Sequence, residues 1–217
     1  YDIVADSQTQ PVGSGGGTAA PLGVGVYKAG PDGIDSALTY GVTVTEGQSP
    51  STDTFTKPLT TGWNLISLPL TPEDSSTSAV LGNDTIVYDK VYRYDATTPK
   101  QFVDETSGTM EPGIGYFVYV TTAGTWNYTG TSVSSTDLDL KSGLNMIGVP
   151  NCTISISSAM GSTDYRYVAR WNAAEEKFEV HNLKAPSAFH DFTTMVAGEG
   201  YFISASSDYP LTLSCSG

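Results

Sequence analysis

Two histidines are the first residues of this chain that could carry acid–base or metal chemistry. His181 and His190 lack zinc-type neighbours, since neither belongs to a His-x-x-x-His or Cys-x-x-Cys pattern. A Cys–His pair for nucleophilic catalysis would need Cys152 or Cys215, the two cysteines of the chain. We therefore expect solvated or hydrogen-bonded histidines without a catalytic role.

Carboxylates offer the next possible chemistry. Glu175 and Glu176 could be compared with the paired carboxylates of a glycosidase. Neighbours on a strand point to opposite faces, however, and in a turn both side chains mainly contact water. We interpret the pair as part of a solvated turn, and we expect no enzymatic activity; a secreted hydrolase remains the third and weakest hypothesis.

A structural calcium ion is the one cofactor that stays open as an alternative. Loop oxygens could come from Asp32 with Asp35, or from Asn83 and Asp84 with Asp89. No complete calcium-loop spacing is present. A melting temperature that is the same in excess calcium and in chelator would remove this idea.

Two glycine pairs resemble nucleotide-binding loops at first sight. They lie at residues 113–115 and 198–200, but each is followed by Tyr-Phe-Val or Tyr-Phe-Ile, which is typical of a strand. A phosphate loop needs a helix N-terminus at that point. We interpret these glycines as turn residues.

Composition favours an exported protein. The net charge is −13, and the ten Lys and Arg residues are scattered, so nucleic acid is not an expected partner. No apolar run reaches the roughly 20 residues that cross a bilayer. Ser and Thr are abundant while charged residues make up only 15%. The chain starts at Tyr1 rather than Met, so we expect a processed or excised form from the extracellular space or cell surface.

The chain contains the same sequence pattern twice. Gly-Trp-Asn-Leu-Ile-Ser-Leu-Pro at 62–69 returns as Gly-Leu-Asn-Met-Ile-Gly-Val-Pro at 143–150. Three further pairs follow in the same order: 91–96 with 168–173, 100–102 with 176–178, and 110–118 with 195–203. What repeats is apolar residues and turn glycines, which indicates two copies of one folding unit with a structural or binding role.

Local patterns predict strands with few helices. Each repeat should form about five or six strands, including hairpins across 95–99 and across 121–124, and one helical turn near 78–82 or 158–161. The fold class is therefore all-β: two tandem homologous small β-sandwich or barrel-like units. We divide the chain into a flexible arm at 1–21, a two-stranded segment at 22–56, and β-repeats at 57–133 and 134–217.

The cysteines stand near the beginning and the end of the second repeat. Neighbouring strands of a closed unit could bring Cys152 and Cys215 together, so we predict a disulfide. The alternative is two buried free thiols. Three sequons, at Asn83, Asn127 and Asn151, fit the same oxidising and glycosylating compartment.

The repeated phrase resembles a known module. Gly-Trp-Asn-Leu-Ile-Ser-Leu-Pro-Leu, then Tyr-Asp-Ala-Thr-Thr, then Glu-Pro-Gly-x-Gly-Tyr-Phe-Val-Tyr is similar to a β-repeat of large secreted, surface-layer-like and adhesin-like proteins of archaea and some bacteria. The resemblance covers about residues 59–217. In the second repeat Leu144 replaces Trp63, and Ala197 replaces Pro112. It implies an extracellular β-module and carries no catalytic residues.

Aromatic residues are numerous for a chain with so little charge, with three Trp, thirteen Tyr and seven Phe. Exposed rings on a β-face would stack on sugars or pack against a neighbouring subunit. We expect the rings within the repeat pattern to be core, and the off-pattern tyrosines to be freer to face a partner. The first set is Trp63, Trp126, Trp171, Tyr116 and Tyr201, and the second is Tyr88, Tyr165, Tyr167 and Tyr209.

The sequence favours two functions over the hydrolase. The first is a self-assembling extracellular subunit of a filament, sheath or surface layer, whose arm adds a strand to a neighbour through Tyr1, Ile3 and Val4. The second is an adhesin or carbohydrate-binding module of a larger secreted protein. Expected partners are copies of the chain itself and, for the second function, glycans.

Overall fold

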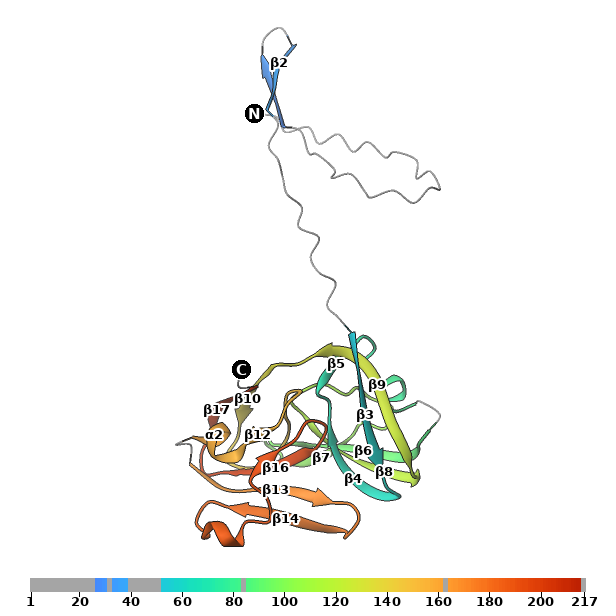
Figure 1. Cartoon of the computed structure of the whole chain (residues 1–217), viewed down its shortest axis with the longest axis vertical. Helices are drawn as coiled ribbons and strands as arrows, with labels where there is room; N and C mark the ends of the chain where they lie inside the picture. The colour runs from blue at the N-terminus through green and yellow to red at the C-terminus, as the bar shows by residue number, and fades with distance from the viewer. Residues whose placement is uncertain (1–25, 31–32, 39–51, 83–84, 162–163, 216–217) are drawn as a thin grey trace. The chain divides into compact units, whose positions relative to one another are not determined.

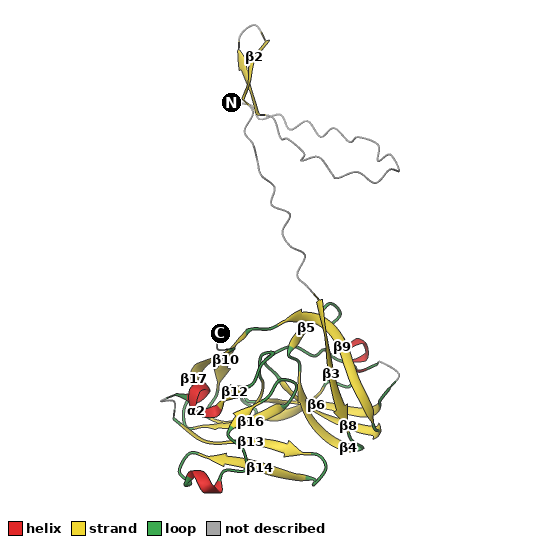
Figure 2. Cartoon of the chain, in the orientation of Figure 1, coloured by secondary structure: helices red, strands yellow, loops and turns green. Residues whose placement is uncertain are grey.

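The computed structural model describes residues 26–30, 33–38, 52–82, 85–161 and 164–215. Strands dominate these residues, and the helices are short (Figure 2). The chain divides into two compact units, Tyr1–Ser49 and Pro50–Gly217. The predicted all-β class is confirmed. The boundary predicted between residues 133 and 134 lies inside the second unit.

The first unit contains one antiparallel hairpin. Strand β1 (Val26–Gly30) pairs with β2 (Gly33–Leu38), and the register shifts between Lys28 and Ala29. The predicted two-stranded segment thus contains two paired strands, and its residues 39–51 lie outside the described residues. The predicted arm at 1–21 lies outside the described residues.

The first half of the larger unit, residues 52–132, is built from two sheets. One sheet has the order β4-β8-β6-β7 and the other has the order β3-β9-β5. The helix α1 (Thr77–Leu81) lies between β5 and β6 in the chain. The strands are β3 (Thr52–Leu59), β4 (Gly62–Ser67), β5 (Leu70–Pro72), β6 (Val87–Asp95), β7 (Gln101–Asp104), β8 (Gly115–Thr122) and β9 (Gly124–Ser132).

The second half, residues 135–215, repeats this plan. Its main sheet has the order β11-β16-β13-β14, and β10-β17 and β12-β15 form two smaller sheets. The helical pieces are α2 (Ile156–Met160) and the 3-10 turn η1 (Ser187–Phe189). The strands are β10 (Ser135–Leu140), β11 (Gly143–Gly148), β12 (Ile154–Ser155), β13 (Tyr165–Asn172), β14 (Lys177–Asn182), β15 (Thr194–Met195), β16 (Gly200–Ala205) and β17 (Tyr209–Ser214).

The two main sheets use matching strands in the same order. Each starts with the Gly-Trp-Asn or Gly-Leu-Asn strand, and each places the Gly-Tyr-Phe strand second. The two pairs are β4 with β8, which Figure 1 labels, and β11 with β16. The short helices also match, since α1 and α2 are followed by Gly82 and Gly161. These two helical turns and the β6–β7 hairpin were predicted correctly.

One predicted hairpin is wrong. Residues 116–120 and 125–128 were expected to pair across 121–124, but β8 pairs with β4 and β6, whereas β9 pairs with β3 and β5. The chain passes from one sheet to the other between Thr122 and Gly124. A Cβ at Gly124 would lie 1.9 Å from the Thr85 carbonyl oxygen, so glycine permits this tight crossing. It brings Trp126 and Tyr128 of β9 over the core.

Each half has its own apolar core. The first includes Ile66, Tyr116, Val118 and Trp126, with Val80 and Leu81 from α1. The second includes Ile147, Tyr201 and Ile203 in matching strands. Alternation places these side chains on the inner face of each main sheet, as expected for sandwiches.

The repeated asparagine explains why Gly-x-Asn occurs twice. The buried Asn64 donates Nδ2–H to the carbonyls of Thr60 (2.7 Å) and Gly62 (3.0 Å), and its Oδ1 accepts from the Thr60 amide. Asn145 makes the same bonds to Lys141 and Gly143. The glycines have φ of 96° and 98°, a region that favours glycine. The repeat therefore encodes a turn.

The main sheets of the two halves pack on each other through their outer faces. Leu65 and Phe117 from the first half meet Met146, Ala169 and Phe202 from the second. The main-chain contacts are also paired: the Ser67 amide donates to the Gly198 carbonyl (3.1 Å), and the Gly148 amide donates to the Gly113 carbonyl (2.9 Å). Since Ser67 matches Gly148 and Gly113 matches Gly198 in the repeat, the two halves meet through equivalent positions.

Candidate functional site

An aromatic groove opens on the outer face of the first main sheet, at its contact with the second half. We define this aromatic groove by Trp63, Tyr92, Phe102, Phe117 and Trp171, and its volume is about 360 Å³. Four of the rings come from β4, β6, β7 and β8, and the fifth comes from β13. Both halves therefore build it.

Strand register puts these rings on one face. Phe117 of β8 lies opposite Leu65 on β4 and opposite Tyr92 on β6. Trp63 is two residues from Leu65 and therefore shares its face. The other face of the sheet carries the core residues, such as Val118, so the groove rings point away from the first core.

Trp63 contacts three other aromatic rings. Its centroid lies 5.0 Å from Tyr119, 6.0 Å from Phe117 and 6.0 Å from Tyr92. The Trp63 carbonyl accepts a hydrogen bond of 2.8 Å from Nε1 of Trp171, which ties the two halves together at the groove. Edge-to-face contacts of this kind stabilise a preformed arrangement of rings.

The expectation for the repeat-pattern rings is confirmed for three and wrong for one. Trp126, Tyr116 and Tyr201 are fully buried. Trp63 is 37% exposed, although its position in the repeat suggested core. The reason is that its strand face is covered by the second half only from Leu65 onwards. Trp171 is half-buried and packs against the contact between the halves.

The off-pattern tyrosines are less available than expected. Tyr165 is only 4% exposed and belongs to the second core, so that prediction is wrong. Tyr88, Tyr167 and Tyr209 are half-buried and pack against apolar clusters. The strands of Tyr88, Tyr165 and Tyr167 have register shifts at these residues, which locally change the direction of side chains.

Three groove rings were not singled out from the sequence: Tyr92, Phe102 and Phe117. A signal was present, because Tyr92 and Tyr94 are two residues apart and Phe102 lies across the predicted hairpin. That spacing places Tyr92, Tyr94 and Phe102 on one face of a β-ribbon. Phe102 is 54% exposed, which makes it the most open ring of the groove.

A polar pocket of about 260 Å³ lies next to the groove and shares Trp171 with it. Its charges are paired: Lys57 contacts Glu199, and the Arg170 Nε donates to Glu179 (2.7 Å). The Asn172 amide also donates to Glu179 (2.9 Å). Hydrogen bonds from Asn172 and then Arg170 hold the pKa of Glu179 below its usual range, so it stays ionised.

The residues considered for catalysis have the following surroundings. The imidazole of His181 is buried and hydrogen-bonds through Nδ1 to the Phe192 carbonyl (3.0 Å), so the expected hydrogen bond is present. His190 contacts the Asn182 carbonyl (3.0 Å). Glu175 and Glu176 are exposed in the turn between β13 and β14, as predicted. The glycines at 113 and 198 are turn residues with φ of 83° and 81°.

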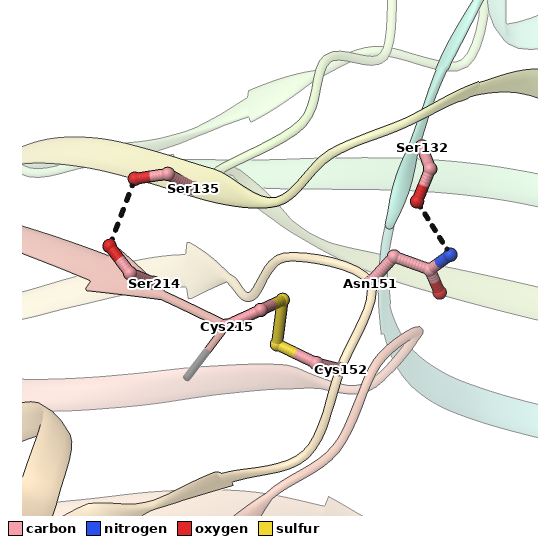
Figure 3. The surroundings of a disulfide bond; sticks show 6 residues. All are labelled: Ser132, Ser135, Asn151, Cys152, Ser214 and Cys215. Carbon is pink, nitrogen blue, oxygen red and sulfur yellow. Dashed lines mark hydrogen bonds between the residues drawn. A yellow bond between two sulfur atoms is a disulfide. The ribbon is translucent and has the colours of Figure 1, made fainter. Parts of the chain in front are cut away.

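The predicted cysteine pair is joined. Cys152 and Cys215 form a disulfide with an S–S distance of 2.11 Å, close to where Ser135 and Ser214 hydrogen-bond between β10 and β17 (Figure 3). The bond indicates an oxidising compartment. Asn151, a predicted glycosylation site beside it, is exposed and donates to Ser132 (2.9 Å). Asn127 is half-buried on β9.

Several predicted sites lie outside the described residues: Tyr1, Ile3, Val4, Asp32, Asn83 and Asp84. Within the described residues, no group of three or more His, Cys, Asp or Glu side chains could hold a metal ion. None of the helices there is long and apolar enough to cross a membrane.

No family model, curated protein or solved structure matches this chain.

Proposed function

We propose that this chain is an extracellular structural protein that assembles with copies of itself into a cell-surface filament, sheath or layer. The observation that carries the proposal is the aromatic groove, which leaves large apolar rings uncovered on an otherwise well-packed body. Such patches mark interaction sites. The disulfide supports an exported location.

The chemistry of the groove favours a protein partner. Tryptophan, tyrosine and other aromatic residues dominate the binding energy of protein interfaces. Some charged side chains of the same sheets are already paired, as in Arg93 with Glu105 (2.7 Å) and Arg170 with Glu179 (2.7 Å). An apolar partner surface would therefore cover the rings without breaking these ion pairs.

The hairpin of the first unit supports strand exchange between copies. The sheet of β1 and β2 has only two strands among the described residues, and such a ribbon is marginal in water. Addition of a strand from another copy would stabilise it. We assign that role to the arm at 1–21, with Tyr1, Ile3 and Val4 as its apolar anchors.

A carbohydrate-binding or adhesin role is the second candidate. The polar pocket supports it, because Asn172, Glu179 and Glu199 lie beside the ring of Trp171. Sugars combine ring stacking with hydrogen bonds to such groups. A glycan array would give hits that are lost in Trp171→Ala if this role is correct; an array without hits contradicts it.

Negative-stain electron microscopy of the purified chain tests the first proposal. We expect filaments or sheets from the full chain, and fewer or none from a form that lacks residues 1–21 and from Trp63→Ala. Leu144→Ala is the matched control, because Leu144 holds the equivalent repeat position and is equally exposed (36% against 37%). Dispersed monomers in all samples would overturn the assembly role.

A further inference from the structure

A second apolar feature lies on the same body, at the loop between β14 and β15. This knob loop, residues 183–193, contains η1 and carries Leu183 (46% exposed) and Phe189 (74% exposed). Among the described residues, no other large apolar side chain is as exposed as Phe189. In the first half, only residues 105–109 lie between β7 and Met110, so the knob loop belongs to the second half alone.

Hydrogen bonds hold the knob loop in a defined shape. The Val180 amide donates to the Asp191 carboxylate (2.7 Å), and the Asp191 amide donates to the Val180 carbonyl (3.2 Å). Nε2 of His190 lies 3.0 Å from the Asn182 carbonyl and 3.1 Å from that of Ala185. Both partners can only accept, so this nitrogen carries a hydrogen. A loop fixed before binding loses little entropy on docking.

The knob loop cannot fill the groove of its own chain. Phe178 near the start of β14 contacts Trp171 (5.0 Å between centroids), whereas the loop begins after Asn182 at the other end. The four residues between them span roughly 13 Å at about 3.3 Å per residue. Because His190, next to Phe189, is hydrogen-bonded to the Asn182 carbonyl, Phe189 stays near that far end.

We propose that the aromatic groove of one copy receives the knob loop of a second copy, with Phe189 inserted between Trp63 and Phe102. This inference rests on the proposed function and specifies the contact between two copies in the assembly. A ring added to the groove would gain the edge-to-face partners that Trp63 and Phe117 already provide. The volume of about 360 Å³ is at the lower end of the range of roughly 300–1,000 Å³ for binding pockets.

The charges beside the groove and in the knob loop also support this contact. Asp104 lies opposite Tyr92 in the β6–β7 pair, on the groove face, and is exposed. Hydrogen bonds from Thr106 hold the pKa of Asp104 below its usual range, so it remains negative. The knob loop carries Lys184, one of only ten basic residues in a chain of net charge −13. The contact thus brings a scarce positive charge towards a negative one.

The geometry of this contact has a consequence for assembly. A knob and a groove at different places on one body form a heterologous contact, which leaves one free knob and one free groove after each addition. Such contacts extend into a fibre or close into a ring. Like charges on the copies oppose growth, so raised salt should favour it.

A mixing experiment with the full chain tests the proposal, followed by sedimentation velocity at raised ionic strength. Phe189→Ser removes the knob and keeps the groove, while Trp63→Ala removes the groove and keeps the knob. We expect each variant alone to need at least a tenfold higher concentration for half-assembly than wild type. Their equimolar mixture should form a species of two chains where each alone is monomeric, because one complete contact remains.

Matched controls separate this contact from lost folding. Val87→Ser removes another exposed apolar side chain (54%), and Leu144→Ala changes the position equivalent to Trp63; both should assemble like wild type. Near-UV circular dichroism checks that all variants fold. Phe189→Ser that assembles like wild type, or a mixture that stays monomeric, overturns the knob contact while the assembly role stands. A wild-type chain that never assembles overturns both.

Discussion

The two halves of the larger unit share their framework and differ in what they expose. Both have the buried asparagine of the turn, the tyrosine whose hydroxyl accepts from a backbone amide, and the same main-sheet order. On the outer face, however, Trp63 and Tyr92 of the first half correspond to Leu144 and Ala169 of the second. Two groove positions of the first half are therefore aliphatic in the second, whereas the positions of Phe102 and Phe117 keep a phenylalanine there.

This difference separates stability from function within one chain. Positions that are equal in both halves make bonds that the fold needs, such as those of Asn64 and Asn145. Some positions that differ, such as Trp63 and Leu144, are partly exposed, where the fold determines the residue less strictly. The candidate site is therefore found where the repeat is broken, in the aromatic groove and in the knob loop.

The disulfide is the largest difference in covalent structure, and its reduction should have the largest effect. The bond joins two cysteines of the second half that are 63 residues apart in the sequence. In the chain-entropy model its loss lowers the free energy of unfolding by about 4 kcal/mol. Urea denaturation with and without reductant measures this change, and hydrogen exchange should show β10 and β17 losing protection first. Equal loss in β3 and β9 would contradict a local effect.

The equivalent asparagines should respond alike. Asn64→Ala and Asn145→Ala each remove three turn hydrogen bonds and leave backbone groups at a buried position without a partner. We expect each variant to lose about 2–3 kcal/mol in urea denaturation. If one variant were near wild type, the two turns would not be equivalent and the shared framework would be in doubt.

The equivalent tyrosines give a pH test of the same idea. Burial raises the pKa of Tyr116 and of Tyr201 from 10.0 to about 12. A folded-state pKa above the unfolded value means that their stabilisation is complete below pH 10 and is lost as pH rises towards 12. Each ring accounts for on the order of 2 kcal/mol. Tyr116→Phe and Tyr201→Phe should each reduce this alkaline loss by a similar amount, measured by denaturation from pH 8 to 12.

Much of the framework could be predicted from the sequence, because it rests on local signals. The repeated turn glycines, the helical turns and the 95–99 hairpin follow from residue types and spacing. The hairpin across 121–124 could not, since whether two neighbouring strands pair or change sheets depends on the core that Trp126 completes. The contact between the two main sheets could not be predicted either, because it depends on tertiary packing.

The candidate site was less predictable than the framework. The repeat placed Trp63 in the core, and only the packing of the second half on Leu65 rather than on Trp63 leaves that ring exposed. The exposed Phe189 carries no sequence signal, because its loop has no counterpart in the first repeat. The cysteine pair was predictable because it closes the second repeat.

Sedimentation velocity of wild type, Trp63→Ala and Leu144→Ala over a range of concentrations tests the central claim most directly. Both substitutions shorten a side chain of the same exposure at equivalent positions, and near-UV circular dichroism checks that both variants fold. We predict that wild type and Leu144→Ala associate into large species and that Trp63→Ala remains monomeric. Equal behaviour of the two variants, or a monomeric wild type, would contradict the account.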